Sequence, residues 1–310
     1  MGLSVAACER AVVAALVGLT LIAAGCRRRE KVVVKLTTLQ GESAILPRVE
    51  RASKEGLTQL SKHTIDVGGR SRLYVLIEPT TLVPDKQYPL VLVYHGDGGT
   101  ALGMHDAWPW EEATGTDAIL AYPDGIGSTW ELERTKDNKD VAFAVALIED
   151  IAKKKSIDRS RIFATGYSSG GFMANVLACH KPGLLRAIAS NAGGAPYNQL
   201  EKWPNGYPKC PGQKPTATLA LHGERDYGVT IDSGRFSAEY WAYVNGCKLD
   251  EMETTGYQEC RVYRGCPEGK AVGFCDIPTL GHWVWDRAAE ASWTFFERQS
   301  GMTPSNVRAQ

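Results

Sequence analysis

Short apolar segments alternate with amphipathic segments along most of the chain. Several of the apolar segments are apolar at consecutive positions rather than at every second one, which is typical of strands covered on both faces of a sheet. The segments that predict strands are residues 72–77, 89–94, 118–122, 161–165, 187–190 and 216–221. The segments that predict helices are residues 141–154, 169–180, 234–245 and 285–299.

This order of segments predicts the fold class. Strands that alternate with helices indicate an α/β fold with a mostly parallel sheet and helices on both faces. Asp140 directly precedes a predicted helix and belongs to the residue types that cap helix N-termini, so we expect it to be the N-cap. No internal repeat or Ser/Pro-rich linker divides the region, so we predict one domain over residues 61–300 and a tail over residues 301–310.

The beginning of the chain has a different pattern. Residues 11–25 form an uncharged apolar run, which is short for a transmembrane helix and fits the apolar part of a secretory signal. The run ends in Ala-Ala-Gly-Cys at Cys26, which resembles a bacterial lipobox and implies cleavage after a signal peptide over residues 1–25 and a lipid on the Cys26 sulfur. Ala23 stands where Leu is usual, and ordinary secretion is therefore the alternative. Residues 26–60 would tether the domain to the membrane.

Cysteine usage agrees with export. An even set of cysteines in an oxidising compartment predicts three disulfides that stabilise the fold. Residues 260–264 and 271–275 are typical of two strands joined by a turn, and a symmetric hairpin places Cys260 opposite Cys275. The chain has no C-x-x-C pair, and we expect neither a metal site nor a cofactor. The six cysteines of the predicted domain are Cys179, Cys210, Cys247, Cys260, Cys266 and Cys275.

The charge of the chain bears on its partners. Lys+Arg and Asp+Glu each number 35, so the formal net charge is zero. Nucleic-acid binders usually carry a basic excess, and we therefore expect no nucleic-acid partner.

A candidate nucleophile lies in the sequence Gly-Tyr-Ser-Ser-Gly-Gly, which begins at Gly166. The G-x-S-x-G pattern is informative where a strand precedes it and a helix follows it, because the serine then lies on a sharp turn at the carboxyl end of the sheet. Both neighbours are predicted here. Ser168 is therefore the candidate nucleophile.

A serine nucleophile needs a base and an acid. His282 lies in a loop before the last predicted helix, and Asp226 directly follows a predicted strand, so the order is Ser168, Asp226, His282. Glu224 and Asp232 are alternative acids. An oxyanion hole needs two backbone N–H donors. We expect them from Ser169, the residue after the nucleophile, and from Asp97 in a Gly-rich loop, with Gly98 as the alternative to Asp97. We expect structural roles for His95 and His222.

Several of these motifs recur together in one family. They are HGDGG at residues 95–99, YPDG at 122–125 with Trp130 downstream, DVAF at 140–143, GYSSGG at 166–171, HGERD at 222–226, NGC at 245–247 and GHWVW at 281–285. Over residues 60–300 the chain resembles the secreted feruloyl esterases and polyhydroxybutyrate-depolymerase-like esterases, which are related to carbohydrate esterase family one. The resemblance implies an α/β-hydrolase fold, carboxylic-ester hydrolysis and the same triad.

Two positions depart from the family pattern. Many relatives have Cys where Asp97 stands, and because that position is used through its backbone N–H, we expect its function to persist. Many relatives have Pro after the tryptophan, whereas Asp286 follows Trp285 here. The family's pocket shape near His282, and with it the family's substrate, therefore does not carry over directly to this chain.

The substrate can be narrowed further. Tyr167, Trp283 and Trp285 adjoin the triad residues, and their aromatic planes could stack on a ferulate ring or a sugar. We expect an ester substrate linked to plant polysaccharide, as in a feruloyl esterase. The alternatives are a polyester, as in a polyhydroxybutyrate depolymerase, an acetylxylan or short-chain ester, and, outside the enzymes, a surface binding protein without turnover.

Overall fold

The computed structural model describes residues 56–133 and 136–301. The predicted signal peptide, Cys26, and most of the predicted tether and tail lie outside these residues. Within the described ranges no helix is both long enough and apolar enough to cross a membrane.

The described residues form twelve strands, six α-helices and one short 3₁₀ helix. The strands are β1 (Thr58–Asp66), β2 (Ser71–Pro79), β3 (Tyr88–Tyr94), β4 (Ile119–Pro123), β5 (Ile157–Tyr167), β6 (Ala187–Asn191), β7 (Glu201–Lys202), β8 (Pro208–Lys209), β9 (Ala217–Gly223), β10 (Met252–Thr254), β11 (Cys260–Tyr263) and β12 (Val272–Ile277). The helices are α1 (Ala101–Ala107), α2 (Glu111–Thr114), η1 (Ile126–Ser128), α3 (Lys139–Lys154), α4 (Ser169–His180), α5 (Ile231–Asn245) and α6 (Ala288–Gln299).

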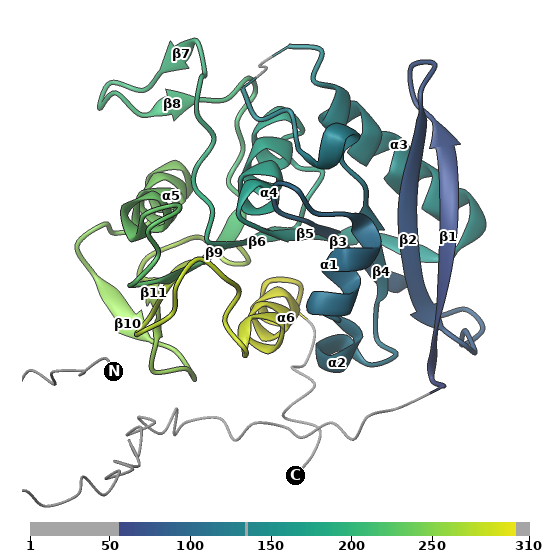
Figure 1. The fold of residues 1–310 in the computed structure, drawn as a ribbon. Coiled ribbons are helices and arrows are strands. Elements are labelled where there is room, and N and C mark those ends of the chain that lie inside the picture. The colour runs from purple at the N-terminus through teal and green to yellow at the C-terminus, as the bar shows by residue number, and fades with distance from the viewer. Residues whose placement is uncertain (1–55, 134–135, 302–310) are drawn as a thin grey trace, which may run out of the picture. The chain divides into compact units, whose positions relative to one another are not determined.

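Ten of the strands form a single sheet in the order β1-β2-β4-β3-β5-β6-β9-β12-β11-β10 (Figure 1). The pairs from β4 to β12 in this order are parallel. The pairs at both ends of the sheet are antiparallel. The predicted α/β fold with a mostly parallel sheet is confirmed.

Each predicted strand and helix has a counterpart in the structure. The six predicted strands correspond to β2, β3, β4, β5, β6 and β9, and the four predicted helices to α3, α4, α5 and α6. Where a predicted element has a counterpart, the two differ only at their ends, where hydrophobic pattern carries little information. The structure also contains elements that the sequence analysis did not predict, among them β1, β7, β8, β10, α1 and α2.

The predicted N-cap of α3 was wrong. The side-chain oxygen of Asn138, not of Asp140, accepts hydrogen bonds from the N–H groups of Asp140 and Val141. Asp140 lies inside the helix and pairs with the buried guanidinium of Arg72 at 2.6 Å. A buried arginine needs a carboxylate partner, and this long-range requirement is invisible in the local pattern.

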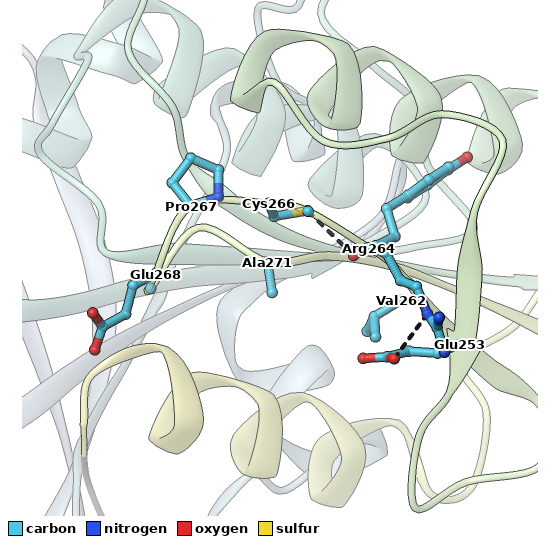
Figure 2. A pocket seen from close by; sticks show the side chains of 10 residues that line it. Glu253, Val262, Arg264, Cys266, Pro267, Glu268 and Ala271 are labelled. Atoms are coloured by element: carbon cyan, nitrogen blue, oxygen red, sulfur yellow. Dashed lines mark hydrogen bonds and ion pairs between the residues drawn. The ribbon is translucent and has the colours of Figure 1, made fainter.

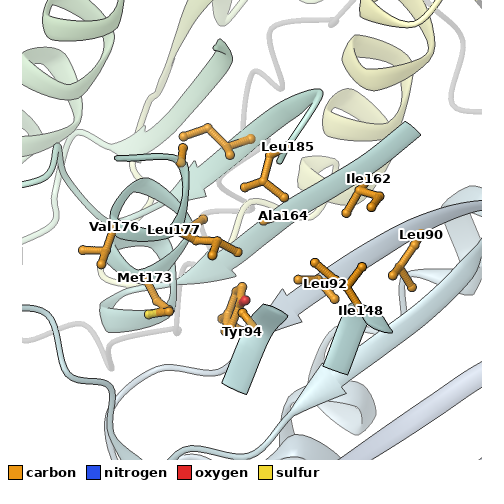
Figure 3. Packing of buried hydrophobic residues seen from close by; sticks show 14 of the residues in the cluster. Leu90, Leu92, Tyr94, Ile148, Ile162, Ala164, Met173, Val176, Leu177 and Leu185 are labelled. Carbon is orange, nitrogen blue, oxygen red and sulfur yellow. The ribbon is translucent and has the colours of Figure 1, made fainter. Parts of the chain in front are cut away.

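Two core layers hold helices on both faces of the sheet (Figure 1). Along β3, Leu90 and Leu92 point to the layer that contains α3, α4 and α5, and Val91 and Val93 point to the layer that contains α1, α2 and α6. Figure 3 shows the first layer, where Met173 and Leu177 of α4 lie over the sheet. Strand residues buried on both faces explain why the strands are continuously apolar.

Three disulfides join the cysteines of the domain, as predicted. Cys260 and Cys275 are opposite each other in the β11–β12 pair and are bonded, which confirms the pairing expected from the hairpin. The remaining bonds are Cys179–Cys210 and Cys247–Cys266.

Candidate active site

Ser168 lies on a strained turn between β5 and α4. Its backbone has φ 54° and ψ −120°, a region that residues with a Cβ seldom occupy. The turn is tight because its neighbours lack side chains. A Cβ on Gly166 would lie 2.4 Å from the backbone of Gly170, and a Cβ on Gly170 would lie 2.3 Å from the carbonyl oxygen of Tyr94. The glycines thus let the strand and the helix approach closely enough to expose Ser168.

The three residues of the predicted triad lie in one hydrogen-bonded row. Nε2 of His282 is 2.9 Å from Oγ of Ser168, and Nδ1 of His282 is 2.7 Å from Oδ2 of Asp226. Because a carboxylate only accepts hydrogen bonds, Nδ1 carries the proton and Nε2 is free to accept the Ser168 proton. This arrangement has the geometry of a nucleophile activated by an oriented base.

The carboxylate of Asp226 is buried and fully hydrogen-bonded. Its Oδ1 accepts from the N–H groups of Gly228 and Val229, both at 2.9 Å. Burial by itself would raise the pKa of Asp226, but the hydrogen bonds from His282, Val229 and Gly228 outweigh it, and the pKa lies below the ordinary value. Asp226 is therefore ionised near neutral pH.

A second imidazole contacts the same carboxylate. Nε2 of His222 lies 2.7 Å from the carbonyl oxygen of Val229 and 3.1 Å from Oδ2 of Asp226. Because the Val229 carbonyl only accepts, Nε2 of His222 carries the proton and donates it there, and the Asp226 carboxylate lies close to the same N–H group. Burial lowers the pKa of His222. Sequence reasoning expected a structural role for His222, and this contact with Asp226 had no sequence signal beyond the spacing of four residues.

The two alternative acids are remote from this arrangement. Glu224 is exposed at the surface, and the side chain of Asp232 is 84% exposed and faces Arg235. His282 is hydrogen-bonded to Asp226, so the geometry favours Asp226 over both.

The Gly-rich loop after β3 presents a free backbone donor. The N–H of Gly98 donates to the carbonyl of Ser128 at 2.8 Å, so it is already used. Within residues 56–133 and 136–301, neither the N–H of Asp97 nor that of Ser169 has a hydrogen-bond acceptor. These are the two donors expected from the sequence. The Asp97 side chain turns to Thr129, whose hydroxyl donates to it at 2.6 Å.

His95 fixes the position of this loop. Its Nδ1–H donates to the carbonyl of Gly96 at 2.8 Å, and its Nε2 accepts from the N–H of Gly125 at 2.9 Å. Trp130 donates its indole N–H to the His95 carbonyl at 2.7 Å. Burial lowers the pKa of His95, which keeps the ring neutral, as an accepting Nε2 requires. The expected structural role of His95 agrees with these contacts.

The aromatic residues beside the triad occupy different environments. Trp283 is 46% exposed, and its ring centre is 4.8 Å from that of Tyr167. Trp285 is 8% exposed and packs against Tyr257 in the core. The expectation that both tryptophans face the substrate therefore needs correction, because the apolar core covers Trp285.

Tyr167 also makes a contact that the sequence did not indicate. Its hydroxyl donates to the backbone carbonyl of His282 at 2.7 Å, and a Cβ on Gly96 would lie 2.8 Å from its ring. Tyr167, the last residue of β5, therefore contacts both the loop that carries His282 and the Gly-rich loop after β3. The described residues contain no cluster of three or more His, Cys, Asp and Glu side chains that could hold a metal ion.

Sequence comparison extends this picture. A family described as Phospholipase/Carboxylesterase matches residues 128–263. Feruloyl esterase C of Emericella nidulans is 30% identical over 228 residues, which cover 71% of this chain and 78% of that protein. Feruloyl esterase B of Piromyces equi is 28% identical over 72% of this chain, and the match spans 44% of its own length.

Comparison with solved structures agrees on the fold. The acetyl xylan esterase from Aspergillus awamori superposes with a TM-score of 0.63 at 19% identity, over 76% of this chain and 98% of that one. A ferulic acid esterase superposes with a TM-score of 0.53 at 15% identity, over 79% of this chain and 99% of that one. The solved structures share the α/β-hydrolase fold of this chain. The sequence relatives show that the chain belongs to the esterase family in which the feruloyl esterases are found.

Proposed function

We propose that the chain is an exported serine carboxylic-ester hydrolase that acts through an acyl-enzyme on feruloyl esters of plant polysaccharide. The hydrogen-bonded row from Ser168 through His282 to Asp226 is the observation that carries this proposal. Two further observations support it. Ser168 lies on a strained turn that exposes its hydroxyl, and the N–H groups of Asp97 and Ser169 have no acceptor among the described residues.

In the first half of the proposed reaction, Ser168 Oγ attacks the ester carbonyl carbon and its proton passes to Nε2 of His282. The carbonyl oxygen becomes an oxyanion, which accepts hydrogen bonds from the N–H groups of Asp97 and Ser169. His282 then gives the proton to the departing alcohol oxygen. Asp226 stabilises the imidazolium that exists between these two transfers. The product is an ester between Ser168 and the acid.

In the second half, water takes the place of the alcohol. His282 removes a proton from the water as its oxygen attacks the acyl carbon. When the tetrahedral intermediate collapses, the bond to Ser168 Oγ breaks and His282 returns the proton to that oxygen. The free acid leaves, and the enzyme is regenerated without any cofactor.

The proposed acyl group is aromatic. Trp283 and Tyr167 offer a half-exposed aromatic surface next to His282, and aromatic rings stack well on a planar phenolic acid. The names of the sequence relatives support the same class of ester. Acetyl esters are the second candidate, because the structural neighbour with a TM-score of 0.63 is named an acetyl xylan esterase.

The test is release of ferulate from methyl ferulate by the purified domain. We expect turnover by the unchanged protein and none by Ser168→Ala, whereas Ser160→Ala, at an exposed position of β5, retains it. Turnover by Ser168→Ala would contradict the proposed nucleophile. Release of acetate or hydroxybutyrate, but not ferulate, would assign another ester, and absence of all three activities would favour a binding protein without turnover.

Export and anchoring are separate parts of the proposal. The three disulfides support an oxidising compartment, and the sequence before Cys26 supports attachment of a lipid. Mass spectrometry of the protein expressed in a bacterial host should find a mature N-terminus at Cys26 carrying a lipid. An N-terminus without lipid would indicate ordinary secretion.

A further inference from the structure

A concave site lies outside the triad. A cavity of about 610 Å³ is bounded by the turn between β1 and β2, by the segments around η1 and the start of α3, and by the end of α4. This volume is within the range of sites that bind small ligands, roughly 300–1,000 Å³.

Cations from separate segments surround this cavity. They are Arg70 in the β1–β2 turn, Lys136 and Lys139 at the start of α3, and Lys181 after α4. None of the four forms an ion pair with another described residue. Asp137 is the one carboxylate of the lining. Positive charge therefore exceeds negative charge here, although the whole chain is neutral.

Arg72 and His180 also line the cavity but add no unpaired positive charge to it. Arg72 is 3% exposed and is neutralised by Asp140 at 2.6 Å. Burial lowers the pKa of His180, so its ring is neutral near pH 7. The cationic character of the cavity thus comes from the four unpaired side chains, and it favours an anionic ligand.

A cavity at the edge of the sheet provides a contrast. It is lined by residues of β10, β11 and the turn before β12, and Figure 2 shows its charged side chains. Arg264 is paired there with Glu253 at 3.1 Å, and Glu268 adds a second carboxylate. This cavity has no unpaired cation, so an excess of positive charge is not a general property of hollows on this surface.

The lining of the cationic cavity is also partly apolar. Val67, Ile126, Val141 and Pro211 contribute to it, and Ile126 is 42% exposed. Inorganic phosphate has no apolar surface to place against such residues. A uronic acid does, because its ring has C–H groups and its carboxylate can pair with a lysine or arginine.

The cavity adjoins the segment that supports the proposed oxyanion hole. Ile126 begins η1, and Ser128 at the end of η1 accepts the N–H of Gly98. A polymer bound along this segment could therefore extend toward Ser168. The cavity and the proposed oxyanion hole thus share the η1 segment as a common wall.

We propose that this cavity, which we name the cationic groove, binds the uronate units of an acidic polysaccharide whose ester is hydrolysed at Ser168. The assignment of the polymer as substrate rests on the proposed function, whereas the binding itself does not. Arg70, Lys136, Lys139 and Lys181 pair with the carboxylates, and the apolar side chains contact the sugar rings. Because these ion pairs are exposed, binding weakens as salt rises.

The binding test uses Ser168→Ala, so that its outcome is independent of turnover. Titration calorimetry with oligogalacturonate is expected to detect binding that weakens at high salt and falls by roughly tenfold in Ser168→Ala with Lys136→Glu, Lys139→Glu and Lys181→Glu. In the matched control, three exposed lysines outside the groove are reversed, by Lys62→Glu, Lys153→Glu and Lys202→Glu. The control protein should bind as Ser168→Ala does.

Several results would overturn the proposal. They are absence of oligogalacturonate binding, equal affinity of the variant with three charge reversals, equal binding of a neutral xylo-oligosaccharide, or comparable binding of inorganic phosphate or anionic phospholipid vesicles.

A second measurement separates the groove from the triad. The three reversals in the otherwise unchanged enzyme should leave methyl ferulate hydrolysis intact and lower kcat/KM on a feruloylated acidic polysaccharide. Lack of hydrolysis by the unchanged enzyme would sink the proposed function while leaving the calorimetric result in force.

Discussion

Asp226 accepts three hydrogen bonds and lies 3.1 Å from a second imidazole nitrogen, and these contacts constrain the proposed base. Two backbone N–H groups hold Oδ1, while the imidazoles of His282 and His222 hold Oδ2. An amide in place of the carboxylate would keep the size of the side chain. It would remove the charge and present either a donor or a single acceptor to His282.

Asp226→Asn is therefore expected to lower kcat on methyl ferulate by roughly 10⁴-fold, because the base loses the acceptor that fixes its tautomer. Asp232→Asn, at an exposed carboxylate outside the row, should retain full activity. Steady-state kinetics of the two variants check this. A loss smaller than tenfold in Asp226→Asn would assign the acid to another residue.

His222 acts on the reaction only through Asp226, which makes it a candidate positioning residue. His222→Leu removes the shared donor, and we expect kcat to fall by roughly 10- to 100-fold with little change in KM. His222→Gln retains an N–H donor and should recover part of the loss. If both variants unfold equally, as judged by circular dichroism, or lose activity equally, the donor has no specific role.

At the scale of elements, the hydrophobic pattern identified strands that are buried on both faces and missed a strand that is largely exposed. Strands such as β3 are buried on both faces, and their continuous apolar residues made them visible. β1 lies at the edge of the sheet and has mostly polar, partly exposed positions. It was therefore not predicted as a strand, and the predicted tether over residues 26–60 wrongly included its first residues, 58–60. The Asn138 cap was missed because Asp140 is a good local cap but has a distant partner in Arg72.

The turn between β5 and α4 gives an element-scale prediction. Gly170→Ala would place a Cβ 2.3 Å from the backbone oxygen of Tyr94, and neither β3 nor α4 can move without repacking. We expect a loss of about 2–3 kcal/mol in the free energy of unfolding and a large fall in kcat, because Ser168 shifts with the helix. Urea denaturation and kinetics measure the two effects.

Gly206→Ala is the control for backbone strain alone. Gly206 has φ +87° and no atom within 4 Å of a Cβ, so the cost should be about 1–2 kcal/mol with no loss of activity. If Gly170→Ala were no more destabilising than this control, close approach of the helix to β3 would not be what requires glycine at residue 170.

At the scale of the whole molecule, the sheet order brings the candidate site together. Ser168 follows β5, Asp226 follows β9 and His282 follows β12, and these strands lie within one parallel set whose carboxyl ends share an edge. The sequence order of the three residues and their places after strands could therefore be predicted. The contacts of Tyr167 and His222 could not, because they depend on how loops pack against one another.

The same packing buries several imidazoles and shifts their pKa away from the ordinary value of about 6.5. Burial lowers the pKa of His95 and of His222, and His95 accepts a hydrogen bond at Nε2 that protonation would abolish. His180 has a pKa lowered in the same way. His105 is the opposite case, because its hydrogen bond to Glu111 raises its pKa. Three imidazoles, of which His95 and His222 are fully buried, thus oppose protonation of the folded protein, and His105 favours it.

These shifts set the sign of a stability change between about pH 7 and pH 5.5. Unfolded imidazoles have a pKa of about 6.5, so the stabilisation from buried neutral His95 and His222 is complete above that value and is lost as the pH falls, by up to about 1 kcal/mol each. His105 gains stability in the same interval and opposes them. We expect urea denaturation to give a free energy of unfolding about 1 kcal/mol smaller at pH 5.5, and a larger decrease in His105→Gln. An equal or greater stability at pH 5.5 would mean that His95 and His222 accept protons in the folded state.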